Sequence, residues 1–179
     1  ATPILAQYFK KTDRGDSVVV ATDAGAAKFA GHFAKRLSVP MAIIDKRRFD
    51  DTEQAQSVAL IGDVDGKNAI IYDDEIATGG SIKEAAGILR KFGAKSVRVG
   101  VTHPVFSGPA VDRLLEARLD ELVVTDSIPI PEAKAAALPM LKVLSTAGML
   151  GDASLRIHAA RSISEMMDCW RPASRSSAS

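Results

Sequence analysis

Short apolar runs alternate along the chain with longer segments whose apolar residues recur at helical spacing. The runs have the length of buried β-strands, and the longer segments have the periodicity of helices that cover a sheet. The runs that predict strands are residues 17–22, 40–45, 68–74, 95–103, 120–126 and 141–147. The segments that predict helices are residues 25–37, 81–93, 107–117 and 148–160.

The alternation of strands and helices predicts an α/β fold, a mostly parallel sheet flanked by helices on both faces. Parallel strands that are buried on both faces read as continuous apolar runs, as "SVVVAT" (17–22) does. Residues 1–11 have a further apolar helix face. We expect one domain over residues 1–168. Residues 169–179 should form a disordered tail, because "RPASRSSAS" is small and polar.

Composition and charge limit which kinds of molecule this chain is expected to bind and where it is expected to work. The formal net charge of the 179 residues is +1, which gives no electrostatic case for binding nucleic acid. No apolar run approaches the roughly 18 residues of a membrane span. The single cysteine, Cys169, has no internal disulfide partner, which fits a reducing, cytoplasmic setting.

The stretch "IIYDDEIATGGSIKEAAGIL" (70–89) combines a buried strand, two acids, two glycines and a helix. In an open α/β sheet, ligands bind beyond the carboxyl ends of the strands, where Asp73 and Asp74 stand. The glycines of "ATGGS" (77–81) let backbone N–H groups approach an anion, and the helix N-terminus adds a partial positive charge. The carboxylates would then accept hydrogen bonds from sugar hydroxyls, so the stretch predicts a sugar-phosphate site.

Two other interpretations of this stretch stay open on local physics. The paired acids would also suit a metal ion, and the loop would also serve as a plain strand–helix turn. It is not a Walker A loop, because the Lys-Ser/Thr pair that follows the glycines of that motif is absent.

The residues "IIYDDEIATGGS" (70–81) resemble the phosphoribosyl-diphosphate (PRPP) binding motif, in which two acids precede a Thr-Gly-Gly-Ser/Thr turn. The motif is shared by the phosphoribosyltransferases and by ribose-phosphate diphosphokinase, the PRPP synthetase. Further segments resemble the synthetase in the same order: 18–25, 42–48, 61–70, 102–110, 121–130 and 144–150. The resemblance covers only the second half of that enzyme. It implies a type I phosphoribosyltransferase-like fold, and ATP and ribose 5-phosphate as substrates.

The resemblance also implies roles for single residues. Asp73 and Asp74 would bind the ribose hydroxyls, and Asp23 would lie beside Mg²⁺, the implied cofactor. Lys46 and Arg48 would be catalytic cations. The loop expected around the 5-phosphate consists of Ala77, Thr78, Gly79, Gly80 and Ser81.

Residues 47–57 are polar and have little strand or helix pattern, so we expect a mobile loop that closes over the site. Local sequence alone favours a solvated basic turn in which Lys46 and Arg48 pair with Asp50 and Asp51. The resemblance over the other segments favours the catalytic loop instead.

Within the motif of residues 70–81, two residues depart from the family pattern. Ala77 stands where an aspartate is usual, and Glu75 stands where an apolar residue is usual. Three hypotheses follow: the ribose 5-phosphate-binding half of a PRPP synthetase, inactive alone; a stand-alone phosphoribosyltransferase; or a non-catalytic subunit that binds synthetase subunits. For the first, we expect a homo-oligomer or association with a missing N-terminal half.

Overall fold

The computed structural model describes residues 1–48 and 56–169. In this part of the chain, the strands are β1 (Ser17–Ala21), β2 (Met41–Arg48), β3 (Gln56–Ile61), β4 (Asn68–Glu75), β5 (Ser96–His103), β6 (Glu121–Thr125) and β7 (Leu141–Leu144). The helices are α1 (Thr2–Lys11), α2 (Ala27–Leu37), α3 (Gly80–Lys91), α4 (Ala110–Glu116), α5 (Glu132–Ala136), α6 (Ala147–His158) and α7 (Ile163–Cys169).

The described strands form one sheet in the order β3-β2-β1-β4-β5-β6-β7. All neighbours are parallel except β2 and β3, which pair antiparallel at one edge. The chain moves outward from β1 to β2 and β3, and then returns to the other side of β1 with β4. The junction of β1 and β4 is therefore the place where the strand order reverses.

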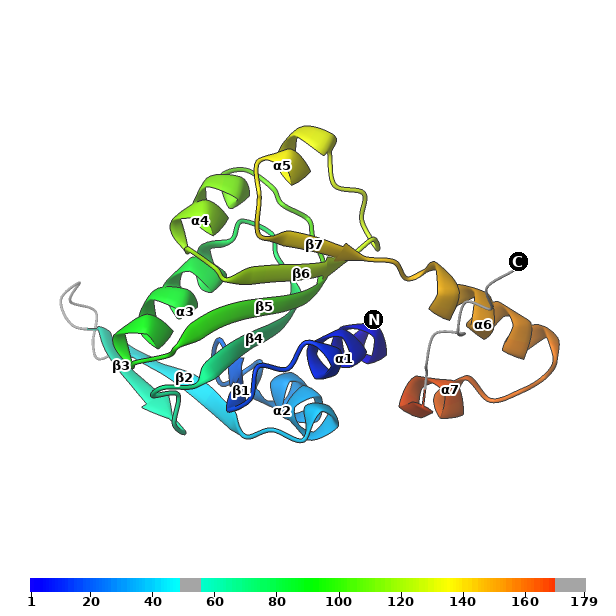
Figure 1. The fold of residues 1–179 in the computed structure, drawn as a ribbon, viewed down its shortest axis with the longest axis horizontal. Helices are drawn as coiled ribbons and strands as arrows, with labels where there is room; N and C mark the ends of the chain where they lie inside the picture. The colour runs from blue at the N-terminus through cyan, green and yellow to red at the C-terminus, as the bar shows by residue number, and fades with distance from the viewer. Residues whose placement is uncertain (49–55, 170–179) are drawn as a thin grey trace.

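Helices cover both faces of the sheet (Figure 1). On one face, α3 and α4 bury Ile82 and Leu114 against a core that includes Val99. On the other face, α1 and α2 bury Leu5 and Phe33 in a second cluster. The predicted α/β architecture, with a mostly parallel sheet and helices on both sides, is confirmed.

The buried guanidinium of Arg98 joins α1 to the sheet through hydrogen bonds and a ring contact. The Arg98 side chain is 1% exposed, and its Nε donates to Glu121 Oε2 at 2.8 Å. Its Nη2 donates to Thr12 Oγ1 at 2.7 Å, and the guanidinium lies 4.7 Å from the centroid of the Phe9 ring. Tyr8 donates its hydroxyl proton to Glu121 as well. Because the buried charge is paired and hydrogen-bonded, it is tolerated in the interior.

The apolar pattern predicts six of these strands and five of the helices, α1 among them, but not β3, α5 or α7. The expectation of a loop over residues 47–57 is wrong at both ends, because β2 extends to Arg48 and β3 begins at Gln56. Backbone pairing of Arg48 with Gln56 extends the hairpin where side-chain pattern gives little indication of it. The middle of that loop and residues 170–179 of the predicted tail lie outside the described residues. The prediction that the tail begins at residue 169 is wrong by one residue, because Cys169 is the last residue of α7. None of the described helices has the length and apolar character needed to cross a membrane.

Candidate functional site

The candidate site lies at the carboxyl ends of β1 and β4. Val20 of β1 pairs with Ile71 of β4, so Asp73 extends two residues beyond that level and stands beside the turn that follows β1. A reversal of strand order leaves a crevice at such a junction, because the two connecting loops diverge. The sequence-predicted acids therefore stand where α/β sheets bind ligands.

Three carboxylates meet at this junction. Asp73 is half-buried, whereas Asp74 and Asp23 are exposed. Burial raises the pKa of the Asp73 carboxyl to about 6, and the negative charges of Asp74 and Asp23 act in the same direction. The opposing contribution is the backbone N–H of Asp74, which donates to Asp73 Oδ1 at 2.9 Å. The turn after β1 is closed by Ala26 N–H, which donates to Asp23 Oδ1 at 2.8 Å.

A glycine in the left-handed region starts α3. Gly79 is the N-cap residue with φ +73°, and no side chain caps the helix. A Cβ at Gly79 would lie 3.3 Å from the carbonyl oxygen of Ala110, so both its conformation and its surroundings require glycine. Residues 73–82 line a pocket of about 230 Å³ at this helix start. The first N–H groups of a helix have no intrahelical acceptor, so the loop can bind an anion.

The far side of this loop is held by the segment after β5. Ser107 N–H donates to the carbonyl oxygen of Ala77 at 2.8 Å, and Phe106 N–H donates to that of Ile76 at 3.0 Å. Arg113 of α4 donates from Nη1 to the carbonyl oxygen of Thr78 at 3.3 Å. These hydrogen bonds to the carbonyl oxygens of Ile76, Ala77 and Thr78 hold the loop in position.

Arg113 is a site residue that the sequence analysis misses. Nothing in its local sequence distinguishes it from a surface arginine of a short helix. The indication is topological: α4 follows β5, and β5 is the neighbour of β4, so the start of α4 lies beside the loop that follows β4. The strand order, which sequence pattern does not supply, is needed to find it.

Lys46 and Arg48 lie in β2, which runs parallel to β1. Ala21, the last residue of β1, pairs with Ile43, so Lys46 lies three residues further along, about 10 Å at the rise of a strand. The backbone therefore carries both residues past the carboxyl edge of β1, on the side of the sheet edge where Asp23 and Asp73 stand.

The carboxylates suit a hard cation. Mg²⁺ prefers oxygen ligands and is usually bound through one or two carboxylates together with substrate phosphates. Among the described residues, no group of three or more His, Cys, Asp or Glu side chains forms a metal cage. Asp23, Asp73 and Asp74 supply carboxylate oxygens of the kind that Mg²⁺ binds together with substrate phosphates.

Comparison with known proteins agrees with this geometry. The phosphoribosyl transferase domain family matches residues 1–132. Ribose-phosphate pyrophosphokinases from Gloeobacter violaceus and Caldanaerobacter subterraneus are each 45% identical to this chain over 92% of its length, and the matches cover 49% and 51% of those proteins. The crystal structure of phosphoribosylpyrophosphate synthetase from Mycobacterium smegmatis superposes with a TM-score of 0.75 at 38% identity, covering 89% of this chain and 49% of that one.

The matches cover most of this chain but only part of each relative. The chain spans about half the length of the curated relatives it matches. The family match covers 132 of its 179 residues, including β1 to β6 and the whole candidate site. On this evidence, the chain belongs to the phosphoribosyl transferase domain family.

Proposed function

We propose that this chain is the C-terminal, ribose 5-phosphate-binding half of a ribose-phosphate pyrophosphokinase. The observation that carries the proposal is the pocket of residues 73–82, where two strand-end acids adjoin an uncapped helix start. The backbone N–H groups of residues 79–81 would bind the 5-phosphate. Asp73 and Asp74 would accept hydrogen bonds from the ribose hydroxyls.

In the proposed reaction, the anomeric hydroxyl oxygen of ribose 5-phosphate attacks the β-phosphorus of ATP. The bond from that phosphorus to the oxygen bridging the α-phosphorus breaks, and AMP leaves with this oxygen. The hydroxyl proton passes to solvent. Residues 73–82 contribute by fixing the sugar in line with the diphosphoryl group, because positioning supplies much of the rate in phosphoryl transfer.

Cationic groups would stabilise the negative charge that develops on the transferred group. Lys46 and Arg48 are proposed for this role, since the backbone of β2 carries them beyond the carboxyl edge of the sheet. Mg²⁺ bound with ATP would neutralise phosphate charge, and Asp23, in the turn after β1, would hold it. The homo-oligomer and the cytoplasmic setting expected from sequence stay predictions.

A stand-alone phosphoribosyltransferase is the less favoured function. The relatives at 45% identity over 92% of the chain are ribose-phosphate pyrophosphokinases. Ala77 in place of the usual aspartate is compatible with phosphate binding, because that residue contributes backbone to the loop.

The phosphate loop is tested by replacing Gly80 with valine. A Cβ at Gly80 would lie 3.4 Å from Arg113 Nη1 and 3.9 Å from Thr78 Oγ1, which are tolerable contacts. The protein should stay folded while the branched side chain blocks approach of the phosphate. Each charge-assisted hydrogen bond lost costs about 1.5–3 kcal/mol. We therefore expect calorimetry to show ribose 5-phosphate affinity lowered at least about tenfold.

The matched control is Gly87→Val, the same substitution in the same helix, where a Cβ meets nothing within 4 Å. It should leave ribose 5-phosphate affinity unchanged. Unchanged affinity in a folded Gly80→Val protein would contradict the proposed site.

A further inference from the structure

Glu75 is a third carboxylate in the pocket of residues 73–82. It is exposed, and it ends β4 two residues beyond Asp73. Alternate residues of a strand point to the same face, so Glu75 follows Asp73 about 7 Å further along that face. The proposed binding of ribose hydroxyls by Asp73 and Asp74 leaves this third acid without a role.

The backbone at Glu75 is held in place by β5. Glu75 pairs with His103 across the parallel strands. The next residue, Ile76, donates its N–H to the carbonyl oxygen of His103 at 3.0 Å, and its side chain is buried in the core. In the described part of the chain, no residue forms a hydrogen bond or an ion pair with the Glu75 carboxylate. Both of its oxygens are therefore available to a ligand, on a strand end that does not move.

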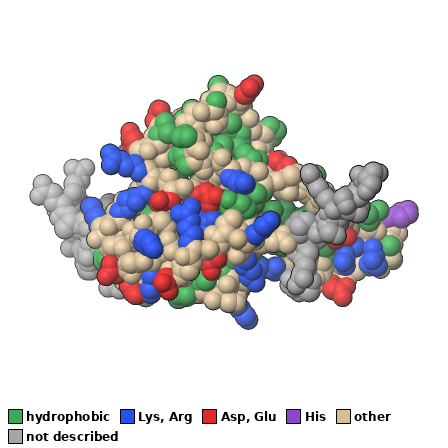
Figure 2. Space-filling model, in the orientation of Figure 1, with side chains coloured by type: hydrophobic (Ala, Val, Ile, Leu, Met, Phe, Trp, Pro, Cys, Tyr) green, Lys and Arg blue, Asp and Glu red, His purple; other side chains and the backbone are tan. Residues whose placement is uncertain are grey.

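The overall charge of the molecule does not decide what enters this pocket. The formal net charge is +1, and Figure 2 shows basic and acidic side chains interspersed over the face in view. Such a surface exerts little long-range attraction on a sugar phosphate. The groups that line the pocket therefore decide which ligand binds.

The hydroxyl groups of the substrate match these acids in number. The ring form of ribose 5-phosphate carries three, on C1, C2 and C3. The neighbouring hydroxyls on C2 and C3 suit the neighbouring residues Asp73 and Asp74, which leaves the anomeric hydroxyl on C1. We infer that Glu75 accepts a hydrogen bond from the anomeric hydroxyl and so orients the oxygen that attacks ATP. This rests on the proposed function, in which the pocket binds ribose 5-phosphate.

The exposure of Glu75 agrees with this assignment. The anomeric oxygen has to face the open side of the pocket, because ATP reaches it from outside residues 73–82. Glu75 is the last residue of β4 and is exposed, whereas Asp73 is half-buried. A charge-assisted hydrogen bond to a fixed acceptor restricts the orientation of the hydroxyl, and orientation of this kind contributes to the rate.

The test compares ribose 5-phosphate with 1,4-anhydroribitol 5-phosphate, which lacks only the anomeric hydroxyl. Calorimetry measures the affinity of the 179-residue chain for each. The wild-type chain should prefer ribose 5-phosphate by at least about tenfold, because only this ligand bonds to Glu75. Glu75→Ile should bind both ligands equally, since isoleucine has no acceptor and suits a strand. Glu75→Gln keeps an acceptor oxygen and should show an intermediate preference.

The matched control is Glu132→Gln on α5, which removes an exposed carboxylate that does not line the pocket. It should leave the preference unchanged. Equal binding of the two ligands by the wild-type chain, or a wild-type preference in Glu75→Ile, overturns the inference and leaves the proposed function standing. If the wild-type chain binds neither ligand, both the inference and the proposed function fail.

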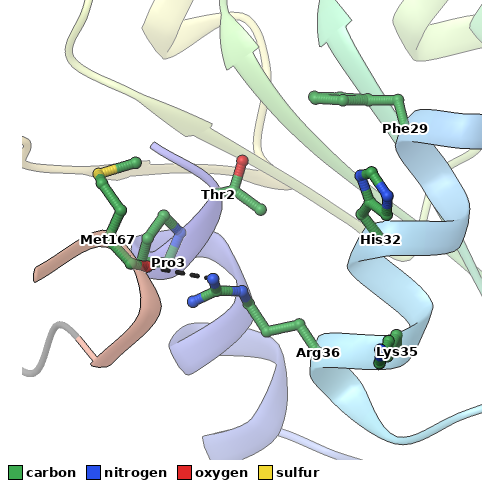
Figure 3. A pocket seen from close by; sticks show the side chains of 7 residues that line it. All are labelled: Thr2, Pro3, Phe29, His32, Lys35, Arg36 and Met167. Atoms are coloured by element: carbon green, nitrogen blue, oxygen red, sulfur yellow. Dashed lines mark hydrogen bonds between the residues drawn. The ribbon is translucent and has the colours of Figure 1, made fainter. Parts of the chain in front are cut away.

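A second hollow, of about 660 Å³ between α1, α2 and α7, also has groups that attract phosphate. Figure 3 shows His32, Lys35 and Arg36 of α2 around it. No Asp or Glu is among the described residues that line it, so it offers no carboxylate to a sugar hydroxyl. Lys35→Gln should therefore leave both affinities unchanged. Loss of ribose 5-phosphate binding in this variant would place the ligand in the second hollow and overturn the inference.

Discussion

At the scale of single residues, the surroundings of Asp73 raise the pKa of its carboxyl group. Its carboxyl is half-buried at the end of β4, and burial together with Asp74 and Asp23 raises its pKa from 3.8 to about 6. A carboxyl with a raised pKa holds its proton more tightly in the folded protein than in the unfolded chain. Its contribution to stability is therefore full below pH 3.8 and is lost as the pH rises through about 6.

We predict that Asp73→Asn raises the melting temperature at pH 7.5, because it removes a carboxylate that is costly to keep charged there. The gain should shrink as the pH falls and vanish near pH 4, where wild-type Asp73 is largely protonated. Asparagine keeps an oxygen that can accept the Asp74 N–H. Thermal unfolding followed by circular dichroism across this pH range measures the effect.

The control for that experiment is Asp112→Asn. Asp112 is exposed in the first turn of α4, where a negative charge is favourable, so its replacement should lower the melting temperature slightly. A lower melting temperature for Asp73→Asn at pH 7.5 would contradict the raised pKa.

Sequence predicts the site residues to the extent that they are contiguous. Asp73, Asp74 and the loop of residues 77–81 follow one another on a strand, a turn and a helix start, so one short pattern identifies them all. Asp23 and Arg113 reach the site through the pairing of β1 with β4 and of β4 with β5. The first was predicted only through resemblance and the second not at all.

At the scale of elements, α1 is seated on the sheet by a close approach to β5. A Cβ on Gly100 would lie 2.6 Å from Cε2 of Phe9, and Phe9 is 1% exposed. The ring has no free space to move into, because it also contacts Arg98 and Phe33. Glycine at position 100 therefore lets the helix lie at its present distance from the sheet.

Gly100→Ala should destabilise the protein by about 1–3 kcal/mol, the usual cost of overpacking a core. In a domain of this size that corresponds to a drop in melting temperature of roughly 2–12 °C. Gly87→Ala in α3, where a Cβ meets nothing within 4 Å, should instead be neutral or stabilising. A melting temperature that Gly100→Ala leaves unchanged would mean that α1 is not held at this distance.

Strands that are buried on both faces were predictable from sequence, whereas the edge strand β3 and the short helices α5 and α7 were not. β1 and β4 read as apolar runs because both of their faces are covered. β3 lies at the sheet edge and ends at Ile61, which is 55% exposed, and its apolar run is only four residues long, 58–61. α5 and α7 have five and seven residues, too few for a helical period to be recognised.

At the scale of the whole molecule, the chain matches about half of each relative and contains the phosphate loop and the strand-end acids. The proposed reaction also needs ATP held in line with the sugar. In the family resemblance, much of the ATP site belongs to the first half. The projection of α6 beyond β7 was not predictable, because the segment has a helical apolar period in sequence and its exposed apolar residues read as core.

We predict that the purified 179-residue chain forms no detectable PRPP with ATP, Mg²⁺ and ribose 5-phosphate. An assay of AMP release measures this, because each turnover liberates one AMP. Adding a matching N-terminal half should restore turnover when the halves associate. Clear activity of the chain alone, abolished by Lys46→Ala, would show that the ATP site is built within these residues.

The pairing of β1 with β4 also governs how the molecule folds. Ser17 pairs with Asn68, so forming this pair closes a loop that contains α2, β2 and β3. Closing so long a stretch is entropically costly, and folding rates fall as such distant pairings dominate. Asp23, which follows β1, and Asp73 of β4 come together only when that loop has closed. A bound sugar phosphate should therefore slow unfolding while leaving the refolding rate nearly unchanged.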